Sequence, residues 1–286
     1  MKKAAILIDS SYGIKDGQYP DVYVAPMEII VTDNGKVTSY LDNVEIFNKD
    51  ICEKISLGVD VKTSQPVIGN VVKILDKITT EYEMIYALPI TSKISGTYTN
   101  WVSLSKEYNN VHVYDQTMVG RLAEWTIADL VDKNKKDELN DATIIEYLNF
   151  TKKHRAGVLV VPDASQLKKG GRVSNFKSLL IKLFGLKLII TLDEHGLLFK
   201  DKAGKVEEAI KKAKRALGDC IPLETKKVKR FVIFRNSEAD AKFNIDEYVR
   251  LVKSMYPDVK IEYVVLPSVI TAHVGPNYFV FGIDLE

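Results

Sequence analysis

Apolar and polar residues follow two different periods along the first half of this chain. Runs of consecutive apolar residues, typical of strands buried on both faces of a sheet, occur at Ala4–Ile8, Met84–Ile90 and Val111–Tyr114. Between the first two runs, apolar residues recur at helical spacing from Ile68 to Ile78. This alternation predicts an α/β fold whose N-terminal part is a mostly parallel, doubly wound sheet with helices on both faces. The other helices predicted here span Asn48–Leu57, Thr99–Tyr108, Leu122–Val131 and Ala142–Lys153.

One stretch of the first half predicts a β-hairpin instead. Glu28–Thr32 and Val37–Leu41 both read as strands, and Asp33-Asn34-Gly35-Lys36 lies between them. Asn-Gly is a favoured pair for a tight turn between antiparallel strands. We therefore expect antiparallel pairing beside the parallel strands.

The pattern changes near His154, where hairpins become more prominent. A strand predicted at Leu186–Leu192 turns at Asp193–Gly196 into a second strand at Leu197–Lys200. We predict two domains, residues 1–155 and 156–286, the second an α/β domain with a partly antiparallel sheet. Its other predicted elements are strands at Ala156–Val161, Lys229–Phe234, Ile261–Leu266 and Tyr278–Ile283 and helices at Phe176–Phe184, Val206–Leu217 and Ile245–Met255.

The composition excludes several classes of protein. Of the 286 residues, 40 are Lys or Arg and 38 are Asp or Glu, so the net charge gives no indication of a nucleic-acid partner. The cysteines, Cys52 and Cys220, are too few for a disulfide framework and suit a reducing cytoplasm. No apolar stretch approaches the roughly 20 residues of a membrane span. The apolar run after Lys3 is too short for a signal peptide, so we expect a cytoplasmic protein.

Two hydroxyl-rich segments stand where a helix is predicted to begin. Thr63-Ser64-Gln65-Pro66 precedes the helix that contains Ile68, and Ser95-Gly96-Thr97 follows the strand at Met84–Ile90. A helix N-terminus exposes backbone N–H groups and the positive end of a dipole, which favour an anion. Loops at the carboxyl ends of neighbouring parallel strands share one crevice, so Thr63 and Ser95 could point at the same ligand. Helix capping alone accounts for either segment taken singly.

The candidate catalytic and metal-binding chemistry is weak. The four histidines are not at the spacing of metal ligands, and we predict no metal and no cofactor. A serine hydrolase could be built from Ser95, His273 and either Asp9 or Asp115, but such residues occur in almost any chain of this length. His273 stands out because small residues surround it, and its ring could donate to a carboxylate held beside Ser95 and Thr63.

Five motifs in order resemble those of the DegV family of bacterial fatty-acid-binding proteins, over nearly the whole chain. The motifs are Asp9-Ser10-Ser11, Thr63-Ser64-Gln65-Pro66, Ser95-Gly96-Thr97-Tyr98, the segment from Leu167 to Ser174 that contains Gly170-Gly171-Arg172, and Ala272-His273-Val274-Gly275-Pro276. The resemblance implies two α/β domains that hold one long-chain fatty acid in a tunnel between them.

The same resemblance implies roles for individual residues. Thr63 and Ser95 would bind the carboxylate, within loops that also contain Ser64 and Gly96, and Arg172 and His273 would lie near the head group. A separate fatty acid kinase would convert the presented carboxylate to an acyl phosphate. The chain itself would then be a substrate-presenting subunit of phospholipid metabolism and not an enzyme.

The sequence departs from the family pattern in two places, which bear on the shape of the tunnel. Asn277-Tyr278-Phe279 follow the His273 motif where small residues are usual, and the segment 116–121 is neither Ser-rich nor Gly-rich. Phe176, Leu180, Phe184 and Ile190 are candidates for the tunnel wall, although an ordinary core position is the simpler interpretation of each.

Two alternatives to a fatty acid carrier stay open at this point. One is a hydrolase or phosphotransfer enzyme that uses Ser95 or His273, and the other is a carrier of a different lipid anion. The basic helix face that contains Lys211, Lys212, Lys214 and Arg215 could contact a partner or, transiently, an anionic membrane. A solvated helix face explains these four residues more simply.

Overall fold

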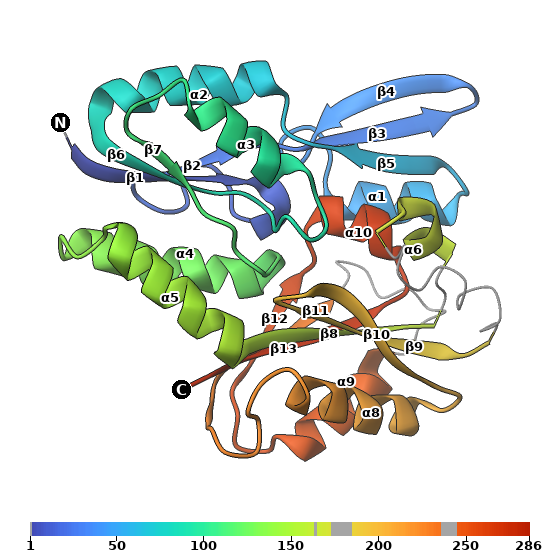
Figure 1. Ribbon diagram of the computed structural model, residues 1–286. Helices are drawn as coiled ribbons and strands as arrows, with labels where there is room; N and C mark the ends of the chain where they lie inside the picture. Colours follow the sequence, from blue (N-terminus) through green and yellow to red (C-terminus); the bar gives the residue numbers. More distant parts are fainter. Residues whose placement is uncertain (1, 163–164, 173–184, 236–244) are drawn as a thin grey trace.

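The computed structural model describes residues 2–162, 165–172, 185–235 and 245–286, and these form alternating layers of helix and sheet (Figure 1). Helices α2 (Ile68–Glu81) and α3 (Thr97–Ser105) cover one face of a parallel sheet. Helices α4 (Gly120–Lys135) and α5 (Asp141–His154) lie between that sheet and a mixed sheet. Helices α8 (Val206–Gly218) and α9 (Ile245–Met255) cover the far face of the mixed sheet.

The parallel sheet contains, in spatial order, β2 (Val22–Ala25), β1 (Lys2–Asp9), β6 (Tyr82–Leu88) and β7 (Val111–Val113). Successive side chains of β1 point to opposite sides of the strand, and helices cover the sheet on both sides, so both faces of β1 are buried. Ala5 and Leu7 pack in the cluster with α2 and α3, whereas Ile6 and Ile8 pack in the cluster with α4. The predicted doubly wound parallel sheet is confirmed.

The mixed sheet is formed by the second half of the chain and explains the hairpin pattern of its sequence. Only the pair β11–β12 is parallel among its described strands. The predicted partly antiparallel sheet is therefore confirmed. In spatial order the strands are β10 (Gly196–Ala203), β9 (Lys187–Asp193), β8 (Arg155–Val161), β13 (Phe279–Leu285), β11 (Val228–Arg235) and β12 (Ile261–Val265).

A small antiparallel sheet stands beside the layers and brings distant parts of the chain together. Its strands are β4 (Lys36–Leu41), β3 (Glu28–Asp33) and β5 (Asp60–Ser64), so the predicted hairpin is correct and gains a third strand. Helix α1 (Asn48–Ser56) and helix α10 (Ser268–Val274) pack against this sheet. Val269 and Ala272 of α10 share an apolar cluster with Ile29 and Val61, although α10 comes near the end of the chain.

The structure corrects the predicted start of two helices. Thr63 and Ser64 close β5 and do not cap a helix, because α2 begins only at Ile68, after Val67. Likewise α3 spans Thr97–Ser105 and not 99–108, with Gly96 before it. In both cases the hydroxyl-bearing residue lies outside the helix, although the Ser95 hydroxyl accepts a hydrogen bond at 3.3 Å from the backbone N–H of Thr97, the first residue of α3.

Two of the later motifs lie in helices that the sequence pattern did not predict. The segment that starts at Leu167 begins within helix α6 (Ser165–Gly170), and of its two glycines only Gly171 takes the left-handed conformation, at φ 74°. The segment around His273, which has no predicted structure, is helix α10. The helix predicted at 176–184, with the tunnel candidates Phe176, Leu180 and Phe184, lies outside the described residues.

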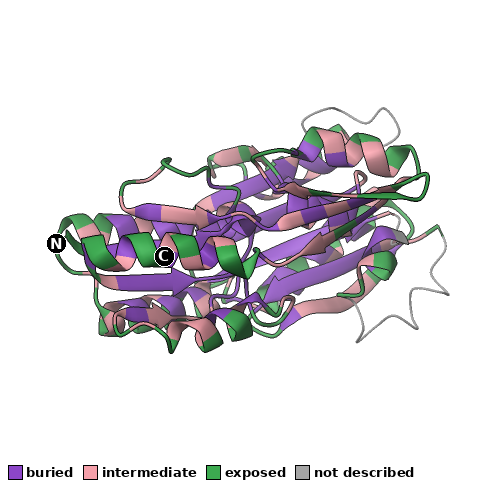
Figure 2. Cartoon of the chain, turned by 90° about the horizontal axis from the view of Figure 1, so that it is seen from above, coloured by how far each residue is buried: buried purple, intermediate pink, exposed green. Residues whose placement is uncertain are grey.

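Burial follows the layers. Figure 2 shows buried residues along the strands and exposed residues on the outward faces of the helices. Within the ranges that the structure describes, each helix is either too short or too polar to cross a lipid bilayer.

Candidate functional site

An apolar cavity with one polar end lies among α4, α10 and the mixed sheet. It encloses about 970 Å³, including space open to solvent. The polar residues among the described part of its wall are Thr63, Ser95, Arg172 and His273. The described apolar residues of its wall are Met27, Ile90, Ile94, Val119, Leu122, Gly157, Val158, Leu159, Leu167, Leu192, Leu197, Phe234, Leu266, Val269, Ile270, Val274 and Val280.

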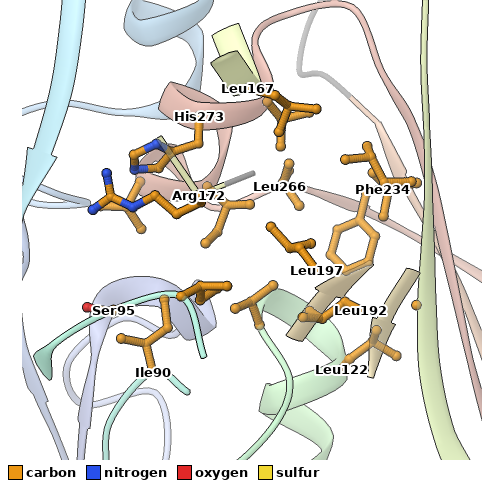
Figure 3. A pocket seen from close by; sticks show the side chains of 18 of the residues that line it. Ile90, Ser95, Leu122, Leu167, Arg172, Leu192, Leu197, Phe234, Leu266 and His273 are labelled. Carbon is orange, nitrogen blue, oxygen red and sulfur yellow. The ribbon is translucent and has the colours of Figure 1, made fainter. Parts of the chain in front are cut away.

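The polar and apolar residues are segregated. Figure 3 shows Arg172 and His273 together at one end, and Leu122, Leu192 and Phe234 on the opposite side. An apolar cavity wall with a few polar groups gathered on one side is typical of sites for apolar small molecules with one polar group.

Thr63 reaches the cavity because of its place in β5. Side chains at alternate positions of a strand share a face, so Thr63 lies on the same face as Val61, which packs in the cluster that contains α10. Ser64 belongs to the other face and is not part of the cavity wall. The side chain of Thr63 therefore meets α10, and its Oγ1 lies 2.7 Å from Nε2 of His273.

Ser95 lies in the turn between β6 and α3, which two side chains hold in place. Asp9 accepts a hydrogen bond from the backbone N–H of Ile90 at 2.6 Å, where this turn begins. Gln65 accepts a bond from Asn100 at 2.6 Å and so joins the turn after Thr63 to α3. Gly96 is outside the cavity wall, and a Cβ atom there would stand 3.0 Å from the Gln65 amide. These contacts keep Thr63 and Ser95 at one end of the cavity.

His273 is held as a neutral imidazole. Burial, and secondly the charge of Arg172, lowers the pKa of His273 to about 4. Its Nδ1 is buried against Gly170 and has no hydrogen-bond partner among the described residues. We place the ring proton on Nε2, because the other tautomer would bury an unpaired donor. His273 then donates to Thr63, whose own hydroxyl hydrogen is free to point into the cavity.

Arg172 supplies the positive charge at this end. It follows α6, and its Nη1 donates to the carbonyl of Gly170 at 2.7 Å. Among the described residues of the wall it is the one side chain with a permanent positive charge. The polar end thus combines a cation with two hydroxyl groups, which suits a carboxylate or another small anion.

The contacts of the same residues do not form a hydrolase triad. His273 bonds to Thr63 and not to Ser95, while the Ser95 hydroxyl lies 2.9 Å from that of Thr97. Asp9 accepts from two backbone N–H groups, and Asp115 accepts from Ser92. In the part of the chain that the structure describes, no group of three His, Cys, Asp or Glu side chains is arranged to hold a metal ion.

The sequence motifs located the polar end but missed most of the apolar wall. Leu192, Leu197, Phe234 and Val280 come from strands of the mixed sheet, where an alternating apolar pattern does not distinguish a cavity wall from core. Ile190, which the sequence offered as a candidate, is fully buried core and is not part of the wall.

Comparison with known proteins agrees with this fold and these motifs. The family model described as "Uncharacterised protein, DegV family" matches residues 3–284. The chain belongs to the DegV family. DegV domain-containing protein MG450 of Mycoplasma genitalium is 32% identical over 299 residues, which cover 99% of this chain and 100% of that protein.

Solved structures of DegV proteins share the fold. The fatty acid binding DegV family protein SAG1342 from Streptococcus agalactiae gives a TM-score of 0.83 at 21% identity, and all of both chains is covered. The Fatty Acid Kinase (Fak) B3 protein of Streptococcus pneumoniae, loaded with linoleic acid, gives 0.75 at 16% identity and covers 99% of this chain and 100% of its own. At these identities the likeness shows the DegV fold alone.

Proposed function

We propose that this DegV protein binds a long-chain fatty acid, with the acyl chain in the apolar cavity and the carboxylate at the polar end. The observation that carries the proposal is the segregation of the cavity wall, in which the polar residues Thr63, Ser95, Arg172 and His273 gather at one end. The names of two structural neighbours support it. One is called a fatty acid binding protein, and the other is described as loaded with linoleic acid.

The energetics of this arrangement favour a long chain. About fifteen methylene groups, at roughly 0.8 kcal/mol each, give a gross transfer free energy of about 12 kcal/mol. Ordering the chain and restricting its translation offset part of that gain. A carboxylate loses its hydration in such a cavity and must be paired or hydrogen-bonded. In our proposal the Thr63 and Ser95 hydroxyls and the Arg172 guanidinium supply those donors.

Presentation to a kinase is the second part of the proposal. In this proposal the bound carboxylate is the acceptor for phosphoryl transfer. The described residues of the polar end include no set of groups for activating ATP, so a separate fatty acid kinase would act on that carboxylate. The neighbour from S. pneumoniae is itself a Fak component. In this view the chain is a cytoplasmic carrier that needs no metal or cofactor and has no catalytic residue, and the domains 1–155 and 156–286 enclose its ligand.

Binding is tested first by identifying the lipid that co-purifies with the protein. Organic extraction and mass spectrometry should give one fatty acid per chain, and native mass spectrometry should give the same ratio. Delipidated protein should then bind a fluorescent fatty acid. An empty protein that takes up no added fatty acid would contradict the proposal.

Site variants test the role of the polar end. Ser95→Ala and Thr63→Val should each weaken fatty acid binding about tenfold, because each removes one hydrogen bond to a charged group. The matched control is Ser103→Ala, an exposed serine on α3. Wild-type affinity in both site variants would refute this placement of the carboxylate, even if a fatty acid binds elsewhere.

The same cavity would also fit a different lipid anion, because an apolar wall does not distinguish between kinds of apolar chain. Competition of a lysophospholipid or an isoprenoid acid against the fluorescent fatty acid separates the two. Tighter binding of either competitor than of a long-chain fatty acid would reassign the ligand.

A further inference from the structure

A second group of polar residues is buried behind the polar end of the cavity, outside its wall. Asp9, Ser10 and Ser11 follow β1, Asp42 follows β4, and Ser268 is the first residue of α10. Asp9, Ser11 and Asp42 are fully buried, and Ser10 and Ser268 are 1% exposed. The proposed function assigns no role to this group, although the Asp9-Ser10-Ser11 motif belongs to it.

Asp9 is satisfied by its neighbours. Its carboxylate accepts hydrogen bonds from the backbone N–H of Ser11 at 2.9 Å and of Ile90 at 2.6 Å. These two donors lower the pKa of Asp9, but burial is the larger influence and raises it, so a negative charge on Asp9 is costly as well.

Asp42 is not satisfied in this way. Neither carboxylate oxygen has a hydrogen-bond partner among the described residues, and the Oγ of Ser268 lacks one as well. The hydroxyls of Ser10 and Ser268 lie close enough to stabilise a charge on Asp42, but the nearby charge of Asp9 opposes it. Burial is the largest influence, and it raises the pKa of Asp42 to about 7.

No described cation is among the main influences on the pKa of Asp42. On α10 the titratable residue is His273, whose ring is neutral and bonded to Thr63. On α1 the carboxylate of Asp50 accepts from the backbone of Phe47, outside the buried group. The other carboxyl of this buried group is Asp9, and a negative charge on it would raise the cost of a charge on Asp42.

We propose that Asp42 is a positioning residue that must be uncharged to seat α10, and that its ionisation loosens the head-group end of the cavity. The inference rests on the proposed function. An uncharged carboxyl can donate its proton to one neighbouring hydroxyl and accept a hydrogen bond from the other, which satisfies both buried oxygens. An ionised Asp42 beside Asp9 must attract water or move away, and Ser268 moves with it because it lies against the same carboxyl.

This movement reaches the ligand through a short path. Helix α10 is seven residues long and carries Val269, Ile270 and His273 into the cavity wall. A shift at Ser268 therefore displaces the bond between His273 and Thr63, which orients the Thr63 hydroxyl. Fatty acid affinity should fall as the pH rises through 7, even though the fatty acid itself remains ionised.

The test is the pH dependence of fluorescent fatty acid binding between pH 6.0 and 8.5. We expect wild-type affinity to fall about tenfold over this range, and Asp42→Asn, which stays uncharged, to hold its affinity constant. Asp33→Asn changes an exposed aspartate at the opposite end of the β3–β4 hairpin and should follow the wild type. A flat wild-type profile, or an equal fall in Asp42→Asn, would overturn the proposal.

A second variant and a second readout keep the test decisive. Ser268→Ala removes a hydroxyl that lowers the pKa of Asp42, so the fall in affinity should move to higher pH; an unchanged midpoint would count against the proposal. The thermal midpoint of ligand-free protein should fall from pH 5.5 to 8.5 by several degrees more in the wild type than in Asp42→Asn. Because that readout needs no lipid, it tests Asp42 even if no fatty acid binds and the proposed function fails.

Discussion

At the scale of single residues, the neutrality of His273 decides what the polar end can do. A protonated imidazole would stand beside the guanidinium of Arg172, and burial makes that charge costly. A neutral ring instead donates one hydrogen bond to Thr63 and leaves the charge of Arg172 available to a ligand. Because the pKa of His273 is low, Arg172 supplies the positive charge and Thr63 supplies an oriented hydroxyl.

The pKa of His273 predicts a loss of stability in acid. Because the folded pKa of about 4 lies below the ordinary 6.5, His273 contributes stability that is fully present above pH 6.5 and is lost as the pH falls through 4. The contribution is at most about 3 kcal/mol and is smaller where solvent reaches the ring. His273→Gln keeps a donor for Thr63 and should lose less stability between pH 7 and 4.5 in urea unfolding.

Two comparisons control this measurement. His195→Gln replaces an exposed histidine and should unfold like the wild type at both pH values. Asp42 acts in the opposite direction over the same range, because its raised pKa gives stability that is lost as the pH rises towards 7. Equal losses in His273→Gln and the wild type would show that the ring is not held neutral.

Gly170 predicts a steric requirement at the same site. A Cβ atom on Gly170 would stand 2.4 Å from Nδ1 of His273, closer than any real contact. Gly170→Ala should therefore displace the ring and weaken fatty acid binding about tenfold or more, measured by fluorescence titration. Gly218→Ala is the matched control, since it also ends a helix and its Cβ meets nothing within 4 Å. Equal affinities in the two variants would contradict the requirement.

At the scale of elements, a buried ionic network joins α4 and α5 to the mixed sheet. Arg155 is 1% exposed and donates to Asp284 at 3.0 Å and to the carbonyl of Leu122 at 2.8 Å. Arg230 also binds Asp284, and both guanidinium groups lie over the ring of Trp125. The network fixes α4, which carries Leu122 to the apolar end of the cavity.

Breaking this network should destabilise the whole fold. Asp284→Asn leaves two arginines without their shared carboxylate, and removal of one partner of a buried pair costs about 3 kcal/mol. Urea unfolding measures the loss. Asp246→Asn removes the partner of Arg235 at an exposed site and should unfold like the wild type. If the two variants unfold alike, the network does not support the fold in this way.

The sequence predicted those elements that are themselves well buried, because burial gives them a recognisable pattern of apolar residues. Buried strands such as Ala156–Val161 show as apolar runs, whereas β5 has one fully buried residue, Val61, and carries no such signal. Helix α10 was missed because Val269, Ile270 and Thr271 are β-branched and resemble a strand, and packing overrides that preference. The contact between Thr63 and His273 spans 210 positions, so no local pattern could predict it.

At the scale of the whole molecule, the cavity lies between layers that come from both halves of the chain. A ligand there should stabilise all layers at once, because it binds the folded state alone. At one hundred times Kd, a fatty acid adds about 2.7 kcal/mol, which should raise the thermal midpoint by roughly 5 °C. Differential scanning calorimetry of delipidated protein measures the shift, and a second transition that ignores the ligand would show that the layers unfold separately.

Helix α10, from the second half of the chain, packs against the small antiparallel sheet of the first half, and this limits how halves of related chains can be combined. Because a helix from residues 268–274 completes a site begun at Thr63, exchanging the second half between two relatives would pair the His273 of one parent with the Thr63 of the other. Such a chimera keeps both residues and still loses their 2.7 Å contact if the two parents seat α10 differently. Such a chimera should therefore bind its ligand more weakly than either parent, so the two halves have to match each other to form the site.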